Sequence, residues 1–360
     1  MKFSNIVVGA GFTGVTIAER LKSRGESVLV IEKRNHIGGN CYDFFDKDGC
    51  YIKLYGPHIF HTSNQRVWNY ISQFTEWNNY RHQVFCFIGN KLIPIPFNLN
   101  SIDLSFGSEK SKLLTNKLIN KYGENAKVSI YTLLNEHDQD LRDLANYVYE
   151  KVFLNYTIKQ WGHKPDELDK SVLNRVPVIV NREDYYFTDK YQGIPLLGYT
   201  KVMEKMLDGI PVMLNTDYKS IINQIAYDKI YYTGPLDYYF DYIYGEIKYR
   251  CIELKFEKHD IEYQENSVIN YPNDNEFTRI TEFNKFMFIK STKTIIAKEY
   301  ASWNQGFVAY PLQNKENLEV INKYFKESGK DKKLVLAGRL AECKYYNMDQ
   351  AILKGIEVTE

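Results

Sequence analysis

The segment Phe3–Asn40 contains the pattern that most restricts the fold of this chain. A short apolar run, Ile6–Val8, leads into a Gly-x-Gly-x-x-Gly pattern and a helical pattern, and a second apolar run, Val28–Ile31, then ends on Glu32. Strand, glycines, helix, strand and acid in this order are typical of a βαβ unit that binds a dinucleotide. We therefore expect a Rossmann-like α/β domain that begins with this segment.

The glycines of the pattern, Gly9, Gly11 and Gly14, each have a physical role in such a unit. Gly9 permits the tight turn, Gly11 lets backbone N–H groups approach a pyrophosphate, and Gly14 lets the helix pack closely on the strand. Glu32 is placed to accept hydrogen bonds from an adenosine ribose. The segment therefore predicts a cradle for the adenosine diphosphate half of a cofactor.

The residues that follow Glu32 decide between cofactors. Arg34 and the pair Gly38-Gly39 resemble the double-glycine extension of FAD-binding proteins rather than the sequence of an NAD dehydrogenase. FAD is therefore the expected cofactor.

Length and composition limit the function classes. A chain of 360 residues is long enough for two or three domains. A formal net charge of +1 argues against a nucleic-acid-binding protein. The five cysteines are scattered without a Cys-x-x-Cys pair, which favours reduced thiols. No apolar run approaches ~18 residues, and the first strand begins too early for a signal peptide, so we expect a cytoplasmic protein without membrane insertion.

Two histidines, His58 and His61, stand three positions apart after Gly56-Pro57. A metal site is disfavoured because Gly-Pro argues against a helix and no third ligand follows at zinc spacing. We expect a rigid loop that presents both histidines to the cofactor, and no metal.

The remaining patterns predict hairpins, helices and a sheet. Hairpins are expected over 42–54 and 83–97, and strands over 176–180, 229–233, 251–256, 267–271, 278–283, 294–300 and 334–337. Helices are expected over 66–75, over 113–153 with a break at Gly123, over 198–207, and from Asp349 as N-cap.

These elements predict an α/β fold in which a discontinuous Rossmann-like FAD-binding domain carries an inserted helical subdomain and an antiparallel β-sheet domain. The expected boundaries are 1–80, 194–240 and 311–360 for the FAD domain, 101–175 for the helical subdomain, and 81–100, 176–193 and 241–310 for the sheet domain.

The segment 156–199 interleaves aromatic residues with Arg and Lys. Trp161, Arg175 and the run Tyr185–Phe187 are its most distinctive members. Such a composition fits nucleobase stacking with phosphate contact, and it fits a surface helix and an edge strand equally well. Spacing alone leaves both interpretations open.

Taken together, the motifs resemble the UDP-galactopyranose mutase family over nearly the whole chain. The resemblance is carried by EKRNHIGGN, YGPHIFHT, YTIKQWG, YQGIPLLGYTK, YTGPLDYYFDY, TRITE and GRLAECKYYNMD. It implies a flavin-dependent isomerase that interconverts the pyranose and furanose forms of a nucleotide-linked sugar, most commonly UDP-galactose. It further implies that N5 of reduced FAD attacks the anomeric carbon and displaces the nucleoside diphosphate, and that the protein is a homodimer.

The resemblance also implies a set of site residues. Arg175 and Arg279 match arginines that clamp the diphosphate, and His58 and His61 match the loop against the flavin. The expected substrate-binding residues are Tyr156, Thr157, Trp161, Tyr186, Arg250, Tyr310, Tyr345 and His82, with Glu299 near them. The expected cofactor-binding residues are Gly9, Gly11, Phe12, Gly14, Glu32, Lys33, Gly39, Asn40, Arg339 and Met348.

Three positions depart from the family pattern. His82 stands where an asparagine is common, Ile179 where an arginine is common, and Asn347 where an aspartate is usual. The exact sugar therefore stays open, with dTDP-fucopyranose or UDP-N-acetylgalactosamine as alternatives to UDP-galactopyranose. A FAD-dependent amine oxidase-like oxidoreductase is the alternative of another class, and a non-catalytic nucleotide-sugar binder is a third.

Overall fold

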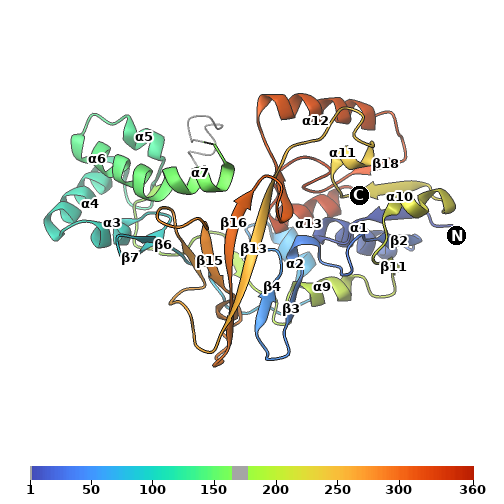
Figure 1. Cartoon of the computed structure of the whole chain (residues 1–360), viewed down its shortest axis with the longest axis horizontal. Coiled ribbons are helices and arrows are strands. Elements are labelled where there is room, and N and C mark those ends of the chain that lie inside the picture. Colours follow the sequence, from blue (N-terminus) through green and yellow to red (C-terminus); the bar gives the residue numbers. More distant parts are fainter. Residues whose placement is uncertain (1, 164–176) are drawn as a thin grey trace. The chain divides into compact units, whose positions relative to one another are not determined.

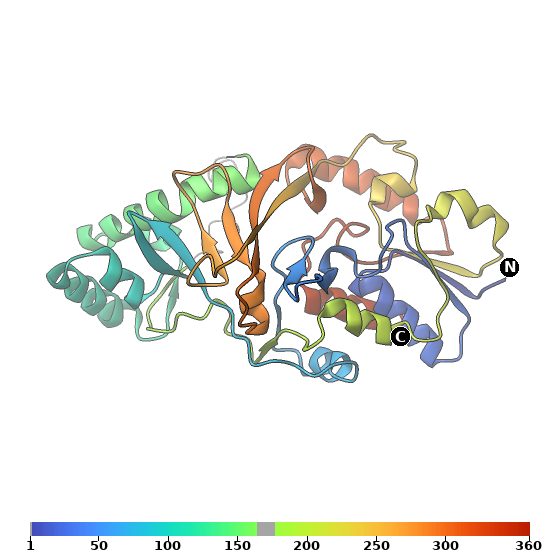
Figure 2. The ribbon, with the colours of Figure 1, turned by 60° about the horizontal axis from the view of Figure 1, so that its bottom comes forward.

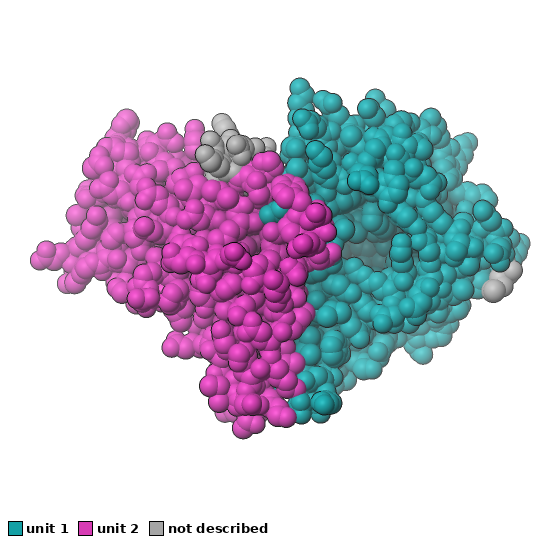
Figure 3. Space-filling model, viewed as in Figure 1, with its two compact units in different colours: residues 1–80, 189–250, 307–360 teal, residues 81–188, 251–306 magenta. Residues whose placement is uncertain are grey.

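The computed structural model describes residues 2–163 and 177–360 (Figure 1). Their contacts divide the chain into two compact units, each made from separate stretches of sequence (Figure 3). Unit 1 comprises Met1–Tyr80, Asp189–Arg250 and Phe307–Glu360, and unit 2 comprises Arg81–Thr188 and Cys251–Gly306. The expected division of the second unit into a helical part and a sheet part stays a prediction.

Unit 1 is built on a parallel sheet whose strands run in the order β11-β2-β1-β12-β18. The strands are β1 (Asn5–Val8), β2 (Val28–Ile31), β11 (Val212–Met213), β12 (Lys229–Tyr232) and β18 (Leu334–Leu336). Helix α1 (Phe12–Ser23) connects β1 to β2. The expected Rossmann-like βαβ unit is therefore confirmed.

The central strands β1 and β2 of the unit 1 sheet are buried on both faces, as is usual in parallel sheets. On one face, alternate residues of β1, β2 and β12, such as Ile6, Leu29 and Ile230, form a core with Tyr218 and Ile225. On the other face α1 packs against α9 (Tyr199–Met206) and α13 (Met348–Glu357), as Figure 2 shows.

The smaller elements of unit 1 surround this sheet. Strands β3 (Asp43–Phe45) and β4 (Tyr51–Lys53) form the first expected hairpin, and β5 (Phe60–Thr62) pairs with β10 (Tyr191–Gly193). The other elements are α2 (Gln65–Ile71), α10 (Tyr218–Ile221), α11 (Leu236–Tyr239), β17 (Phe307–Pro311), α12 (Lys315–Ser328) and 3-10 turns over Gly39–Cys41 and Ile222–Gln224.

Two local expectations in unit 1 are wrong. His61 lies on β5, so the loop that carries His58 ends before Phe60. Asp349 is the second residue of α13 and not its N-cap. Helix α13 begins after Asn347, whose backbone N–H is accepted by the side chain of Gln350 at 2.9 Å. The N-cap is therefore Asn347, two residues before the expected Asp349, and Gln350 supplies the reciprocal bond of a capping box.

Unit 2 combines a mostly antiparallel sheet with a group of helices. Its strands run in the order β13 (Tyr249–His259), β16 (Thr294–Ser302), β15 (Arg279–Glu282), β14 (Val268–Asn270), β6 (Val84–Ile88), β7 (Lys91–Ile95). All neighbours are antiparallel except β14 and β6. The expected antiparallel sheet and the 83–97 hairpin are therefore confirmed.

The helices of unit 2 are α3 (Leu99–Ser105), α4 (Ser108–Tyr122), α5 (Ile130–Leu134), α6 (Gln139–Val148), a π-helical turn (Tyr149–Leu154) and α7 (Asn155–Trp161), and a 3-10 turn covers Phe283–Met287. They include those expected over 113–153, with the break at Gly123 after α4, and two more, α3 and α7, that lie outside that range. A short pair, β8 (Lys127–Val128) and β9 (Val178–Ile179), takes the place of the longer strand expected over 176–180.

The cysteines and the helices give two further observations. All five cysteines are free thiols, as their spacing predicted. In the part of the chain that the structure describes, every helix is too short or too polar to cross a membrane.

Candidate functional site

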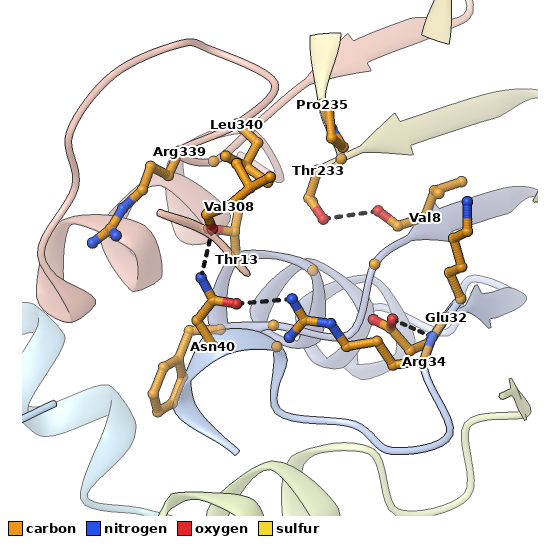
Figure 4. A pocket seen from close by; sticks show the side chains of 18 of the residues that line it. Val8, Thr13, Glu32, Arg34, Asn40, Thr233, Pro235, Val308, Arg339 and Leu340 are labelled. Carbon is orange, nitrogen blue, oxygen red and sulfur yellow. Dashed lines mark hydrogen bonds between the residues drawn. The ribbon is translucent and has the colours of Figure 1, made fainter. Parts of the chain in front are cut away.

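A cavity of about 530 Å³ opens in unit 1 at the carboxyl ends of β1, β2 and β12 (Figure 4). Its wall contains the residues that follow these strands, Gly9, Glu32 and Thr233, together with the segments 307–309 and 338–340. Ligands of parallel α/β sheets bind at this edge, where strand ends and helix N-termini converge. The volume is typical of a site for a small organic cofactor.

The glycines of the first turn shape the cavity in different ways. Gly9 has φ +102°, and a Cβ there would meet Thr233 Oγ1 at 2.1 Å. A Cβ at Gly14 would meet the carbonyl oxygen of Gly9 at 2.0 Å, so close packing of α1 requires glycine. A Cβ at Gly11 would meet only Gly39 Cα at 3.7 Å, an ordinary contact. Protein packing therefore does not require glycine at position 11, and the space beside it suits a ligand.

The first turn of α1 is also prepared for an anion. Gly11 caps the helix without a side-chain hydrogen bond, and the first turn holds no acidic residue. The N–H groups at a helix N-terminus are unsatisfied within the helix and carry partial positive charge. This end of α1 therefore fits a pyrophosphate.

Glu32 is buried at the end of β2 and is held by backbone donors. Its carboxylate accepts hydrogen bonds from the N–H groups of Ala10 and Arg34, each at 2.8 Å. A carboxylate has about four acceptor sites, so both oxygens keep capacity for further donors. This arrangement fits a ribose whose hydroxyl groups donate to Glu32.

Arg34 and Asn40 form the polar side of the cavity, and Figure 4 shows their hydrogen bonds. Arg34 Nη2 donates to Asn40 Oδ1 at 2.9 Å, and Asn40 Nδ2 donates to the carbonyl oxygen of Val308 at 3.2 Å. The Arg34 guanidinium lies over the Tyr55 ring at 4.3 Å. Its Nη1 is buried and has no hydrogen-bond partner within residues 2–163 and 177–360, which fits a bound acceptor.

All residues that the sequence indicated for the cofactor lie in the wall of this cavity: Gly9, Gly11, Phe12, Gly14, Glu32, Lys33, Gly39, Asn40, Arg339 and Met348. Their individual roles stay predictions. Sequence reasoning missed Asp217, Tyr238 and Val308, which also line it. Asp217 and Tyr238 lie after the ends of β11 and β12, and Val308 lies within β17. Periodicity alone brings none of these three positions to the cavity.

His58 and His61 occupy different environments. His58 lines the cavity, and its Nδ1 lies 3.0 Å from the carbonyl oxygen of Gly56. His61 is not among the lining residues, and its Nδ1 lies 2.8 Å from Asp189 Oδ2. Within the described ranges, no cluster of three or more His, Cys, Asp or Glu side chains could hold a metal ion.

Unit 2 contains a second group of predicted residues, centred on Arg279. Arg279 Nη2 donates to the Tyr156 hydroxyl at 2.7 Å, and Arg279 Nε lies 3.2 Å from Glu299 Oε1. The group joins α7 to the neighbouring strands β15 and β16, where Arg279 and Glu299 are cross-strand partners. Burial raises the pKa of Tyr156, and the nearby Arg279 charge partly offsets this rise. Tyr156 is therefore a neutral phenol at physiological pH.

Other predicted substrate residues of unit 2 lie on α7 or in the segment that precedes β6. Thr157 is buried on α7, and Trp161 ends that helix. His82 is buried, with its ring 5.7 Å from the rings of Tyr186 and Phe187.

Trp303 was missed by sequence reasoning. A Cβ at Gly162, the residue after Trp161, would meet the Trp303 ring at 2.7 Å, so the indole lies against the end of α7. No pattern in the sequence pairs these two positions.

The remaining predicted residues are in unit 1 or outside the described ranges. Arg250 is buried on β13, and Tyr310 is buried on β17 with its ring 6.2 Å from that of Tyr345. Arg339 lies over the Tyr345 ring at 4.7 Å. Arg175 lies outside the described residues.

Comparisons with known proteins match two stretches of the sequence to family models and the whole fold to solved structures. A family model described as UDP-galactopyranose mutase matches residues 151–345, and a model described as NAD(P)-binding Rossmann-like domain matches residues 7–74. A solved structure of reduced UDP-galactopyranose mutase superposes with a TM-score of 0.76 at 15% identity, covering 100% of this chain and 93% of that one. A putrescine oxidase superposes with a TM-score of 0.57 at 11% identity, covering 100% and 98% of the two chains, which shows the fold alone.

Relatives of closer sequence cover almost the whole chain. A probable UDP-galactopyranose mutase of Klebsiella pneumoniae is 35% identical over 99% of this chain and 93% of its own length. The UDP-galactopyranose mutase of Mycoplasma genitalium is 35% identical with the same coverage. A dTDP-fucopyranose mutase of Escherichia coli is 32% identical over 99% of this chain and 97% of its own length.

The fit of the cavity and these comparisons lead to one assignment. The enzyme is an isomerase, and FAD is its cofactor, for which Glu32, Arg34 and the N-terminus of α1 provide the matching groups. The chain belongs to the UDP-galactopyranose mutase family.

Proposed function

We propose that this enzyme interconverts UDP-galactopyranose and UDP-galactofuranose. The observation that carries the proposal is the Arg279 group, in which one guanidinium is oriented by Tyr156 on one side and by Glu299 on the other. A guanidinium fixed in this way presents its remaining N–H donors in a constant direction. This planar arrangement of paired donors is suited to the oxygens of a diphosphate.

FAD, when bound and reduced, supplies the nucleophile that replaces the nucleoside diphosphate at the anomeric carbon. The task of Arg279 is to hold that diphosphate and to stabilise the negative charge that develops as it leaves. Tyr156 offers a half-buried aromatic face for the nucleobase beside the same arginine. Tyr186, Tyr310, Tyr345 and Arg175 are assigned to the phosphates by resemblance and stay predictions, as do Thr157, Trp161, His61 and Arg250.

A second substrate, dTDP-fucopyranose, is favoured by one observation. His82 is buried, with its ring within contact distance of the rings of Tyr186 and Phe187. The Escherichia coli relative named for that sugar is similar over 99% of this chain. An imidazole there is bulkier than the common asparagine, which favours a sugar with one hydroxyl fewer.

The test uses FAD-loaded protein reduced with dithionite. UDP-galactofuranose, dTDP-fucofuranose and the furanose form of UDP-N-acetylgalactosamine are offered separately, and the pyranose products are separated by chromatography. We expect fastest conversion of UDP-galactofuranose and none by the oxidised enzyme. Preference for dTDP-fucofuranose would replace the proposed substrate, and conversion of none of the three, or oxygen-dependent turnover of an amine, would contradict it.

The proposal includes a cytoplasmic location, a homodimeric state and a role in supplying galactofuranose to a surface polysaccharide. The resemblance supports the homodimer and the polysaccharide role, and the scattered free cysteines support the cytoplasmic location. Cell fractionation and the mass of the purified protein in solution test the first two.

A further inference from the structure

A lysine is buried behind the wall of the cofactor cavity. Lys53 is the last residue of β4 and has a relative exposure of 2%. An ammonium group loses its hydration when it is buried, and this loss is costly unless hydrogen bonds replace the water. Packing alone would favour a methionine or leucine at this position, so the polar end of Lys53 needs another explanation.

Lys53 holds the turn that carries His58 with both its side chain and its main chain. Its Nζ donates a hydrogen bond to the carbonyl oxygen of His58. Its own carbonyl oxygen accepts the N–H of Gly56 at 3.4 Å. Gly56 has φ +105°, a conformation that glycine adopts without strain. The turn between β4 and β5 is therefore fixed at its middle and at its end by one residue.

The imidazole of His58 is oriented by the same turn. The carbonyl oxygen of Gly56 accepts the backbone N–H of His58 at 2.9 Å, and it lies 3.0 Å from the ring Nδ1. A carbonyl oxygen can only accept, so Nδ1 carries the hydrogen in this bond and Nε2 is the acceptor of the neutral ring. Since His58 forms part of the cavity wall, the turn fixes which face of the imidazole the cofactor meets.

Asp43 is the carboxylate nearest to Lys53 on the neighbouring strand, and it is already engaged. It accepts hydrogen bonds from the N–H groups of Tyr199 at 2.7 Å and Thr200 at 2.8 Å, and from the Tyr51 hydroxyl. Asp43 thus anchors the start of α9 by itself. A purely structural role for Lys53 as the counter-charge of Asp43 is therefore not required.

The other groups packed on Lys53 are Tyr199, whose ring lies 4.3 Å from Nζ, and Cys41, which is part of the cavity wall. Burial lowers the pKa of Lys53 to about 7, although Asp43 and Cys41 act in the opposite direction. Both the ammonium and the neutral amine can donate to the His58 carbonyl, so this hydrogen bond persists across the physiological pH range.

We propose that Lys53 is a positioning residue for the cofactor, which holds His58 in the cavity wall and thereby sets the orientation of its imidazole toward bound FAD. The proposal rests on the FAD of the family and is independent of which sugar the enzyme converts.

A double-mutant cycle tests whether Lys53 acts through the His58 side chain. Lys53→Met keeps the volume and removes the donor, and His58→Ala removes the imidazole but keeps the carbonyl oxygen that Lys53 binds. FAD affinity and the absorption spectrum of bound oxidised FAD are measured without substrate. We expect Lys53→Met to weaken FAD binding roughly tenfold and to change the spectrum. In the His58→Ala background the same substitution should change neither.

The matched control is Lys333→Met, because Lys333 is exposed and its Nζ donates to the carbonyl oxygen of Tyr227 at 3.2 Å outside the cavity wall. It should bind FAD as the unmodified protein does. Should Lys53→Met not fold, Lys53→Gln retains a donor and should give a smaller change that again requires His58. Equal effects in both backgrounds, or no effect of Lys53→Met, would overturn the proposal and leave the mutase assignment intact, since no sugar is used.

Discussion

The cofactor cavity of unit 1 is formed mainly by backbone groups, whereas the Arg279 group of unit 2 is formed by side chains. The cavity depends on backbone: glycines without a Cβ, strand ends and the N-terminus of α1. The Arg279 group depends on side chains from α7, β15 and β16, and two of them lie 123 positions apart in the chain. A site made of backbone leaves a compact pattern in the sequence. A site made of distant side chains leaves isolated residues that resemble any other surface arginine or tyrosine.

The largest effects are expected from substitutions in the backbone site, where Gly14 and Gly11 should differ in their effect on stability. Gly14→Ala should destabilise the protein by about 3 kcal/mol and abolish FAD binding, because its Cβ would overlap the Gly9 carbonyl oxygen. Gly11→Ala should bind FAD poorly. Its free energy of unfolding should stay within about 1 kcal/mol of that of the unmodified protein, since its Cβ meets only Gly39. Denaturant titration and the flavin absorbance of purified protein measure both. Normal FAD content in Gly11→Ala would show that the space beside it is not used.

Changing the side-chain site should give the opposite pattern. Arg279→Met should lower kcat/KM by at least about 100-fold through lost stabilisation of the leaving diphosphate, with FAD content unchanged. Arg182→Met is the matched control, because Arg182 is an exposed arginine of unit 2 that pairs with Asp103. Loss of FAD from Arg279→Met would show that the Arg279 group also affects cofactor binding, which contradicts the separation of the two sites.

A smaller effect is expected from the partner of Arg279. Tyr156→Phe keeps the aromatic face and removes the hydroxyl that accepts from Arg279 Nη2. The loss of one hydrogen bond to a charged group should lower kcat/KM about tenfold, as steady-state kinetics can measure. A loss as large as that of Arg279→Met would mean that the hydroxyl itself, and not the orientation of the arginine, is essential.

This contrast explains how much the sequence predicted. The glycines, Glu32 and the strand ends were predicted from spacing because each has a steric or hydrogen-bonding duty that few residue types can perform. The hydrogen bond between Tyr156 and Arg279 followed from no periodicity, and the resemblance named both residues without joining them. His61 was misplaced because a three-residue strand such as β5 has too short a pattern to distinguish from a loop. Trp303 and Lys53 were missed because tertiary contacts alone give them a role.

Both units hold a lysine with a depressed pKa, which predicts a pH effect. Burial lowers the pKa of Lys159 to about 8, and its Nζ donates to the carbonyl oxygen of Tyr271 at 2.6 Å. Between pH 8 and the unfolded value of 10.5, the unfolded state binds more protons than the folded state, so stability rises with pH. The stability of the unmodified protein relative to Lys159→Met should therefore increase over this window, as thermal unfolding can measure. For Lys53 the same rise should begin near pH 7. A difference that stays constant with pH would show that Lys159 is charged in the fold.

The smallest effects should come from helix caps, one in each unit. Asn64 Oδ1 accepts from the N–H groups of Arg66 and Val67, and Ser129 Oγ accepts from that of Thr132. Asn64→Ala and Ser129→Ala should each lower the free energy of unfolding by about 1 kcal/mol in denaturant titrations, with unchanged FAD binding and turnover. A change in turnover for Ser129→Ala would reveal a coupling between α5 and the Arg279 group.

The order of strands in the unit 1 sheet has a consequence for biosynthesis. The central strand β1 is made first, but its neighbour β12 and the edge strand β18 follow only after long intervening segments, most of unit 2 included. A chain emerging from the ribosome therefore carries β1 and β2 for most of its synthesis without the partners that complete their sheet, a situation that slows folding and exposes apolar strand edges. The cavity wall includes residues near the far end of the sequence, such as Arg339 and Met348. We therefore expect FAD to be captured only after β18 and α13 have been made, because the cavity wall is incomplete without them.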